Sequence, residues 1–221
     1  MRKTPTAAFL SSFIIAFAGG AWAQVLGNPV PATAPDRIGV GLGLEQFNRD
    51  LQIDGGSSDD LDYARTTFQV NYGVGKGAMV QGYLGLVRAK PDGGDTFSGQ
   101  EIGANYRQTI DITIPMGDAG IETALLGDLR YGDLDDGESF DYFEITIGYG
   151  GSYPLTQRLN AYGGVLYSEI WGEIGSQDVN ADDNLGFWGG AEFAAAEALR
   201  VSGELHILHE FGIAVLLQYN F

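Results

Sequence analysis

The most constraining feature of this sequence is an alternation of apolar residues with polar or small ones that recurs from residue 37 onward. It is clearest at the end of the chain, in residues 211–221. One face of this segment holds Phe211, Ile213, Val215, Leu217, Tyr219 and Phe221, and the residues between them are Gly212, Ala214, Leu216, Gln218 and Asn220. A period of two is that of a β-strand, whose successive side chains point to opposite faces. The alternation therefore predicts an all-β fold.

The same pattern delimits ten candidate strands of the length that a tilted strand needs to cross a membrane, about 9–11 residues. They span 37–47, 62–73, 78–89, 99–114, 121–132, 140–152, 158–170, 185–194, 199–208 and 211–221. Two places leave eight strands as the alternative. The segment 191–200 is rich in helix formers, and the connection at 208–210 is very short.

Alternation alone does not separate a soluble sandwich, with its apolar face inward, from a membrane barrel, with its apolar face outward. The connections favour the barrel, because short ones (74–77, 115–120, 153–157, 195–198) alternate with long ones (48–61, 90–98, 133–139, 171–184). Aromatic residues near the strand ends would form the two interfacial girdles of such a barrel. We expect Tyr72, Tyr149, Tyr153, Tyr162, Tyr219 and Phe221 in the periplasmic girdle and Phe47, Tyr131, Phe140, Trp171 and Phe187 in the outer one. The prediction is a transmembrane antiparallel up-and-down β-barrel whose last strand pairs with its first.

The start of the chain has the pattern of an export signal. Arg2 and Lys3 precede an apolar stretch, and Ala21-Trp22-Ala23 supplies small residues where a signal peptidase reads them. We predict a signal peptide at 1–23, a proline-containing periplasmic tail at 24–36 and the barrel at 37–221. No later segment approaches the ~20 apolar residues of a membrane-spanning helix.

The net charge argues against one class of partner, and the lack of cysteine excludes one source of stability. The net charge is −17, and loss of Arg2 and Lys3 with the signal makes it −19. Phosphate binding needs a basic surface, so no nucleic-acid partner is expected. The chain has no Cys, so disulfides do not stabilise it. A closed barrel would stabilise the chain, because it pairs every backbone N–H and C=O between strands.

The last residues, Leu217-Gln218-Tyr219-Asn220-Phe221, resemble the final-strand signature of bacterial outer-membrane barrels. The stretch Gly150 to Leu159 is similar to a periplasmic turn of small OmpA-, OmpX- and opacity-type barrels. The resemblance covers nearly all of 37–221 and identifies no subfamily. It implies a location in the cell outer membrane, contact with outer-membrane lipid and lipopolysaccharide, and recognition of Leu217, Tyr219 and Phe221 by the barrel assembly machinery.

Several charged residues fall on the predicted luminal face. They are Glu101, Arg107, Glu122, Asp128, Arg130, Glu144, Arg200 and Glu204. One interpretation is a network of paired charges that fills a narrow barrel, as side chains do in eight-stranded barrels. The other is a polar pathway, for which Gly39, Gly41 and Gly43 would leave room. Large inward residues such as Arg107, Arg130 and Tyr142 meeting across the axis would favour a plug.

The long connections are acidic. They contain Asp50, Asp54, Asp59, Asp60 and Asp62, then Asp133, Asp135, Asp136, Glu138 and Asp141, then Glu173, Asp178, Asp182 and Asp183. The segment 133–138 lacks the ligand spacing of an EF-hand loop. We expect a solvated acidic surface, no specific metal site and no cofactor.

Outer-membrane enzymes form the remaining class. The two histidines, His206 and His209, are an odd number of residues apart and so would point to opposite faces of a strand. No local His–x–Ser arrangement is present, so we expect no catalytic residues. The sequence favours a monomeric, porin-like barrel that passes small solutes or ions. The alternative is a plugged structural or surface-interaction barrel that acts through its acidic loops, and a lipid-modifying enzyme is a distant third.

Overall fold

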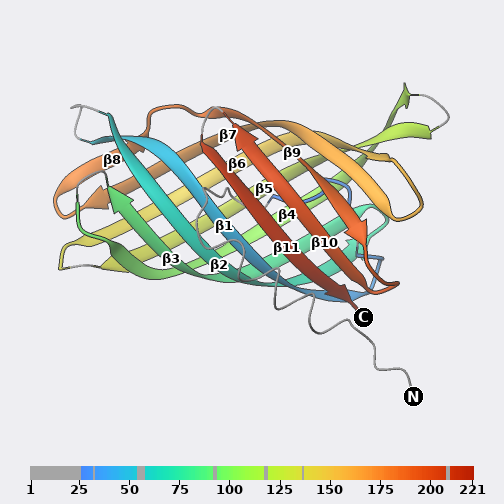
Figure 1. The fold of residues 1–221 in the computed structure, drawn as a ribbon, viewed down its shortest axis with the longest axis horizontal. Coiled ribbons are helices and arrows are strands. Elements are labelled where there is room, and N and C mark those ends of the chain that lie inside the picture. Colours follow the sequence, from blue (N-terminus) through green and yellow to red (C-terminus); the bar gives the residue numbers. More distant parts are fainter. Residues whose placement is uncertain are drawn as a thin grey trace, which may run out of the picture.

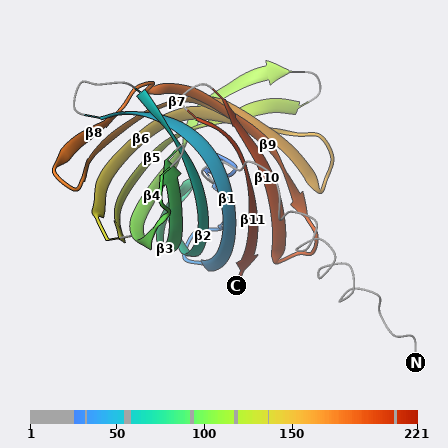
Figure 2. The same ribbon diagram turned by 60° about the vertical axis from the view of Figure 1, so that its left-hand side comes forward.

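The computed structural model describes residues 26–31, 33–53, 58–91, 94–116, 119–135, 137–207 and 210–221. The predicted signal peptide, 1–23, lies outside the described residues. The described chain is a single sheet rolled into a barrel (Figures 1 and 2). Its strands are β1 (Ile38–Ile53), β2 (Ser58–Gly75), β3 (Ala78–Pro91), β4 (Phe97–Met116), β5 (Ala119–Asp135), β6 (Ser139–Pro154), β7 (Leu159–Ile174), β8 (Gln177–Ala181), β9 (Leu185–Ala194), β10 (Leu199–Ile207) and β11 (Phe211–Asn220).

Ten of these strands form the closed wall, and each is antiparallel to its neighbours. Closure occurs between the first and last strands, from the pair Gly39–Asn220 to the pair Asn48–Phe211. The ten-stranded antiparallel barrel and the pairing of its ends are confirmed. The segment 191–200 is the end of β9, a turn and the start of β10, not a helix. Tertiary pairing overrides helix propensity here, because a helix would leave the edges of β7 and β11 unpaired.

The two ends of the barrel differ in circumference. The end that holds Arg37 and Phe221 is the terminal end, and the opposite end, with the β7–β8 turn, is the distal end. Strands β9, β10 and β11 are 9–10 residues long, whereas β1 to β7 have 14–20. Above the three short strands, β8 pairs with both β7 and β1. The distal rim is therefore a circuit of eight strands, an arrangement whose interior side chains just fill.

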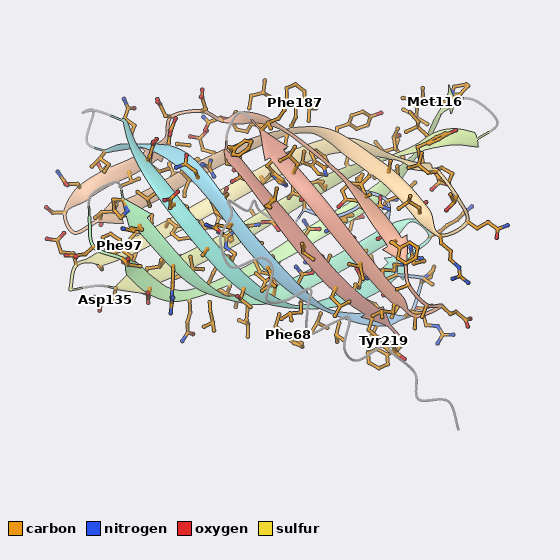
Figure 3. All side chains as sticks on the ribbon, viewed as in Figure 1. Phe68, Phe97, Met116, Asp135, Phe187 and Tyr219 are labelled. Carbon is orange, nitrogen blue, oxygen red and sulfur yellow. The ribbon has the colours of Figure 1, made fainter. Side chains whose placement is uncertain are left out.

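Strand β8 and the full strand lengths were not predicted. The hydrophobic pattern predicts loops at residues 48–61 and 171–184, but β1 continues to Ile53, β2 begins at Ser58 and β7 continues to Ile174. Hydrogen bonding between neighbouring strands continues past the apolar belt, where outward residues such as Asp50 and Asp60 are polar while apolar residues such as Leu51 and Leu61 point inward. At the terminal end, β4 and β5 project as a long hairpin that ends at Met116 and Ala119 (Figures 1 and 3).

The barrel is apolar outside and polar inside. Phe68, Phe187 and Tyr219 point away from the wall (Figure 3), and each has more than 40% of its surface exposed. The exposed face also carries Leu42, Val70, Leu84, Leu86, Ile102, Tyr106, Leu125, Leu129, Phe143, Ile147, Val165 and Leu205. Such a face is stable against lipid and not against water, which is consistent with a transmembrane β-barrel. Among the described residues no helix is long and apolar enough to span a membrane.

Three of the predicted girdle residues lie inside the barrel. Phe47 and Phe140 are 4% and 0% exposed and Tyr162 is 7% exposed, so the girdle assignment is wrong for them. Each has the strand parity of the luminal residues, which proximity to a strand end does not reveal. The predicted girdle residues that do lie on the outer face are Tyr72, Tyr131, Tyr149, Trp171, Phe187, Tyr219 and Phe221, and Tyr153 is half-buried.

Candidate functional site: the filled lumen

The distal part of the lumen is filled by apolar side chains from the wall. They are Phe47, Leu51, Leu61, Tyr63, Val87, Ala89, Phe97, Leu134, Phe140, Tyr142, Ile170 and Val179, all at most 5% exposed. Phe47 stacks on Tyr63 with ring centroids 4.7 Å apart, and Phe140 packs on both Phe97 and Tyr142. Burial of this many apolar groups at the narrowed rim removes them from water. We name these residues the distal cluster.

A buried arginine lies next to the distal cluster, towards the middle of the barrel. Arg65 Nη1 contacts Glu45 Oε2 at 3.0 Å, and its Nη2 contacts Glu101 Oε2 at 2.8 Å. The Tyr142 hydroxyl donates to the same Glu101 oxygen at 2.6 Å. The Arg65 guanidinium also lies 5.0 Å from the centroid of the Phe47 ring. One cation thus joins two carboxylates and the distal cluster across strands β1, β2, β4 and β6.

Two further arginines converge on one carboxylate. Arg49 Nη1 contacts Glu144 Oε1 at 2.6 Å, and Ser168 donates to the same oxygen at 2.6 Å. Arg130 Nε lies 3.7 Å from the other oxygen of Glu144 and 2.8 Å from Asp128 Oδ2. The Tyr83 hydroxyl donates to this Asp128 oxygen as well, at 2.9 Å. These groups cross-link the wall through the middle of the lumen.

The terminal half of the lumen contains residues from the start of the chain. Leu26 is 1% exposed and packs in one cluster with Leu126, Tyr162, Leu166 and Trp188. The predicted tail, 24–36, is therefore not an extended periplasmic segment where the structure describes it. The chain enters the barrel past β2, where Asp36 N donates to Gly73 O at 2.9 Å. A Cβ on Gly73 would lie 2.2 Å from Ala34 O, so only glycine permits this close crossing.

Polar contacts fix the inserted segment. Leu26 N and Gly27 N donate to the two oxygens of Glu204 at 2.7 and 2.6 Å. Arg107 Nη1 donates to Asn28 O at 2.7 Å, and Asn28 Nδ2 donates to Glu192 at 3.3 Å. Nearer the mouth, the Thr33 hydroxyl donates to Asn220 and accepts from Gln218. The inserted segment, residues 26–31 and 33, thus contacts β4, β9, β10 and β11.

His206 extends the contacts of Glu204. Its Nε2 lies 2.6 Å from Glu204 Oε1, and its Nδ1 lies 2.9 Å from Glu210 Oε1. The Tyr162 hydroxyl donates to Glu204 Oε2 at 3.1 Å. Since both ring nitrogens of His206 face carboxylates, this histidine joins the β10–β11 connection to the carboxylate that holds the inserted segment.

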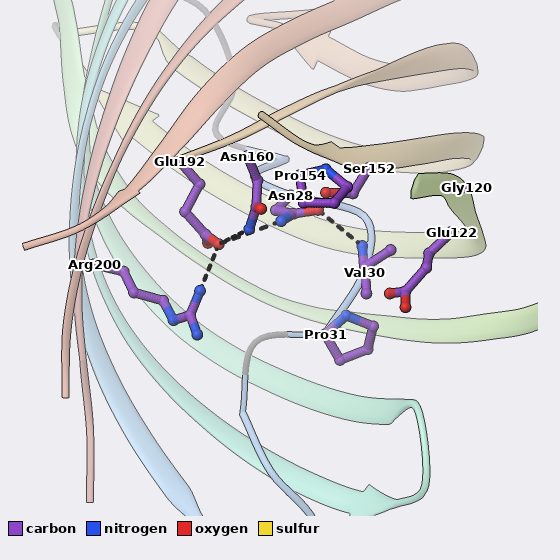
Figure 4. Close-up of a pocket in the computed structure, with 10 residues that line it drawn as sticks. All are labelled: Asn28, Val30, Pro31, Gly120, Glu122, Ser152, Pro154, Asn160, Glu192 and Arg200. Carbon is purple, nitrogen blue, oxygen red and sulfur yellow. Dashed lines mark hydrogen bonds and ion pairs between the residues drawn. The ribbon is translucent and has the colours of Figure 1, made fainter. Parts of the chain in front are cut away.

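A cavity of about 400 Å³ remains at the terminal mouth, beside the inserted segment (Figure 4). Arg200 and Glu122 lie on opposite sides of it in the view of Figure 4, with Val30 and Pro31 between them. Arg200 Nη1 contacts Glu192 Oε1 at 2.8 Å. Glu122 is exposed. This cavity is lined by both charged side chains and the inserted segment.

The predicted luminal residues therefore fall into two groups. Six are buried among luminal polar partners: Glu101, Arg107, Asp128, Arg130, Glu144 and Glu204. Arg200 and Glu122 lie at the mouth. The room expected above Gly41 and Gly43 is taken by neighbouring side chains, since added Cβ atoms would lie 3.3 Å from Gln69 and 2.4 Å from Thr67.

Sequence reasoning missed Glu45, Arg49, Arg65, Glu192 and Glu210. The sequence did contain a signal for Glu45 and Arg49, namely their strand parity. Gly39, Gly41 and Gly43 were placed on the luminal face, and the same parity continues through Glu45, Phe47 and Arg49 once β1 is extended.

Leu217, Tyr219 and Phe221 lie on the outer face of the closing strand region. Tyr219 and Phe221 are 45% and 64% exposed, and their rings pack edge to face at 5.0 Å. Their expected recognition by an assembly machinery stays a prediction.

The distal rim carries acidic side chains, among them Asp50 and Asp60. Among the described residues no group of three or more His, Cys, Asp or Glu side chains is placed to hold a metal ion. Asp50 and Asp60 are cross-strand partners on β1 and β2, beyond the apolar belt. A hydrogen bond with Asp60, followed by burial and the repulsion of Asp60, Asp182 and Asp183, raises the pKa of Asp50 to about 6.

No family model and no curated protein matches this sequence. Solved structures match its fold. An outer membrane channel from Pseudomonas putida superposes with a TM-score of 0.54 at 12% identity, over 89% of this chain and 98% of that one. The outer membrane protease OmpT from Escherichia coli matches with a TM-score of 0.48 at 11% identity, over 86% and 99% of the two chains. The transport unit of the autotransporter AIDA-I from Escherichia coli gives 0.39 at 12% identity, over 99% and 98%. The similarity to the outer membrane channel, together with the closed antiparallel barrel, gives this chain the fold of an outer-membrane β-barrel. Its membership of the OmpA- and OmpX-type group stays a prediction.

Proposed function

We propose that this chain is an outer-membrane β-barrel whose lumen is closed in its resting state. The observation that carries the proposal is the continuous filling along the axis. The distal cluster, the ion pairs of Arg65, Arg49 and Arg130, and the inserted segment follow one another from one end to the other. Large inward residues meet across the axis, which is the arrangement that favours a plugged barrel over an open pore.

The apolar belt and the similarity of fold to an outer membrane channel support a location in the outer membrane. In this proposal the terminal end faces the periplasm, where an exported chain begins, and the acidic distal rim faces outward. The rim then becomes the surface on which a plugged barrel acts, towards lipopolysaccharide or other envelope components. The protein is a monomer, and its closing strand carries the assembly signal at Leu217, Tyr219 and Phe221.

Conductance of the refolded chain beginning at Gln24 in a planar bilayer tests the proposal. A heat-dependent shift in gel mobility first establishes that the barrel has folded. We expect a folded barrel that is electrically silent over minutes at moderate voltage. Reproducible unitary steps from the unmodified chain would contradict a closed resting lumen.

A second candidate is a channel for small solutes or ions that opens when the lumen is rearranged. One observation favours it: the terminal half is occupied by a chain segment and not by the wall alone. Under this candidate, voltage or a periplasmic ligand produces conductance steps, and charge reversal at Glu122 or Arg200 at the mouth changes their ion selectivity.

We propose no catalytic function. His206 contacts two carboxylates, and the buried hydroxyl of Ser168 donates to Glu144 rather than facing a histidine. A nucleophile and its base need mutual hydrogen-bond reach; the described contacts of His206 are to carboxylates and those of Ser168 include Glu144 and Thr146, and His209 lies outside the described residues. Lipid A that stays unmodified in cells expressing the protein is the expected result.

A further inference from the structure

The inserted segment is recognised mainly through its backbone. Three successive residues contribute main-chain groups: Leu26 N, Gly27 N and Asn28 O. Glu204 accepts from the first two, and Arg107 donates to the third. Hydrogen bonds to main-chain groups recognise any peptide that can adopt the same backbone shape, as in other peptide-binding sites.

Two features select which peptide fits. The Leu26 side chain enters an apolar hole made by Leu126, Tyr162, Leu166 and Trp188. Gly27 has a φ of +70°, and a Cβ there would lie 3.2 Å from Arg107 Nη1. A left-handed residue following an ordinary one aims consecutive N–H groups at one point, which suits a carboxylate. We call the wall residues that contact the inserted segment the cradle: Glu204, Arg107, Glu192, Leu126, Tyr162, Leu166 and Trp188. The cradle fits an apolar residue followed by glycine.

The wall side of this cradle is held without the segment. Glu204 contacts the Tyr162 hydroxyl and His206 Nε2 as well as the two backbone N–H groups. Arg107 Nε donates to Asn105, and Glu192 pairs with Arg200. These wall contacts preorganise the carboxylates and the guanidinium, so the cradle keeps its shape when the segment leaves.

On its C-terminal side the inserted segment continues through Pro35, Asp36 and Arg37 into β1. Among the described residues before β1, Pro35 forms a single bridge with Gly73, and Asp36 and Arg37 complete the turn into the first strand. Residues 26–31 belong to no strand. A ligand tethered in this way is held by its local concentration, which is in the millimolar range for short flexible connections.

We propose that the terminal half of the lumen is a peptide-binding site and that the inserted segment is its resident, exchangeable ligand. The ligand class is a short peptide with an apolar residue followed by glycine. From the proposed function, this inference takes only that the lumen is closed in its resting state. Its test uses no conductance, so failure here leaves the closed barrel standing.

Trp188 supplies the readout. The chain has three tryptophans, and the form beginning at Gln24 retains Trp171 on the outer surface and Trp188 in the cradle. In the form beginning at Gln24 and carrying Trp171→Phe, Trp188 is the single tryptophan, and its emission reports whether Leu26 occupies its hole. Gly27→Val, which cannot adopt the required φ and meets Arg107, should displace the segment and shift this emission to the red.

A synthetic peptide with the sequence of residues 24–34 is then added to the refolded Gly27→Val barrel. We expect it to restore the blue-shifted Trp188 emission with saturation. The same peptide carrying Gly27→Val should bind at least 10-fold more weakly. A barrel with the additional change Glu204→Gln should also lose at least 10-fold in affinity, whereas Glu197→Gln, in the exposed turn between β9 and β10, should not.

Two results would overturn the proposal. In one, the unmodified barrel and the Gly27→Val barrel give the same Trp188 emission, so the segment does not occupy the cradle. In the other, displacement is seen but the native peptide binds no better than the Gly27→Val peptide, so the segment is a structural strap. If Gly27→Val does not fold, Leu26→Asp places a charge in the apolar hole and replaces it as the displacing variant in the same assay.

Discussion

The distal half of the lumen is closed by side chains of the wall strands, whereas the terminal half is closed in part by a segment that belongs to no strand. In the distal half, the filling side chains belong to strands whose backbones are paired on both sides, so they cannot leave without unfolding the wall. In the terminal half, part of the filling comes from residues 26–31, which form no strand. The distal filling is therefore fixed to the wall, whereas the terminal filling is removable under the proposed exchange of the inserted segment, and variants in each half should differ in what they disturb.

The largest expected effect is in the wall-borne half. Arg65→Ala leaves Glu45 and Glu101 buried without their shared cation. Breaking such a pair from one side costs about 3–5 kcal/mol, and we expect a loss of this size in urea unfolding of the refolded barrel. Arg88→Ala, at an exposed position on β3, is the control and should change stability by less than about 0.5 kcal/mol. Equal effects of the two would argue against an energetically important luminal network.

Two tyrosine hydroxyls, one inside the barrel and one outside it, test whether the luminal contacts carry the stability. The buried Tyr142 hydroxyl donates to Glu101, whereas the exposed Tyr131 hydroxyl donates to Asp141. Tyr142→Phe should cost about 1–3 kcal/mol because a buried carboxylate oxygen, Glu101 Oε2, loses one of its two donors and keeps Arg65 alone. Tyr131→Phe should cost almost nothing, since water replaces the bond. The measurement is again the urea midpoint, and a larger loss for Tyr131→Phe would place the important contacts on the outside of the barrel.

Gly27→Ala should disturb the terminal half and spare the distal half. The left-handed backbone at Gly27 costs an alanine about 1–2 kcal/mol, which loosens the inserted segment. In the Trp171→Phe background, acrylamide should quench Trp188 more strongly, while the urea midpoint of the wall changes little. Gly82→Ala, where no atom lies within 4 Å of the added Cβ, should leave quenching unchanged. An unaltered Trp188 in Gly27→Ala would mean that the segment and the wall form one rigid unit.

The smallest effect belongs to the acidic rim, outside both halves. The pKa of Asp50 is raised to about 6, so the folded barrel holds this proton more tightly than the unfolded chain. The associated stabilisation is complete below the ordinary carboxyl value of 3.8 and is lost as the pH rises through about 6. Asp50→Asn should therefore flatten the decline in thermal midpoint between pH 4 and 7, and salt should mask the difference. Asp95→Asn, at an exposed position, should leave the slope unchanged.

The sequence predicted the wall far better than the filling. Alternation predicted all ten transmembrane strands and the pairing of 211–221 with 37–47, because the period of two is imposed by lipid on one side and a polar lumen on the other. It missed β8, a strand of five residues in which Val179 is the one large apolar side chain and points inward, so no outward apolar alternation marks it. It placed Phe47 and Phe140 outside because an inward apolar cluster breaks the rule that the luminal face is polar.

The inserted segment could not be predicted from periodicity. Residues 26–31 form no strand, and their partners Glu204, Glu192 and Arg107 lie 79 to 178 positions away along the chain. Only the closed wall brings these residues to one place. The positive φ of Gly27 and the crossing at Gly73 are likewise consequences of the tertiary arrangement, so a glycine-rich composition alone did not mark them.

The central claim, a lumen closed from both ends, is tested most directly by thiol accessibility. The chain has no Cys, so single-cysteine variants need no background changes. Thr146 is 1% exposed in the middle of the lumen, and Glu122 is exposed at the terminal mouth. In barrels refolded in lipid vesicles, a membrane-impermeant maleimide supplied to both faces should label Glu122→Cys rapidly and Thr146→Cys at least 100-fold more slowly, on the order of the 2.7 kcal/mol that this ratio represents. Labelling of Thr146→Cys at a rate close to that of Glu122→Cys would contradict the closed lumen and favour an open pathway through the barrel.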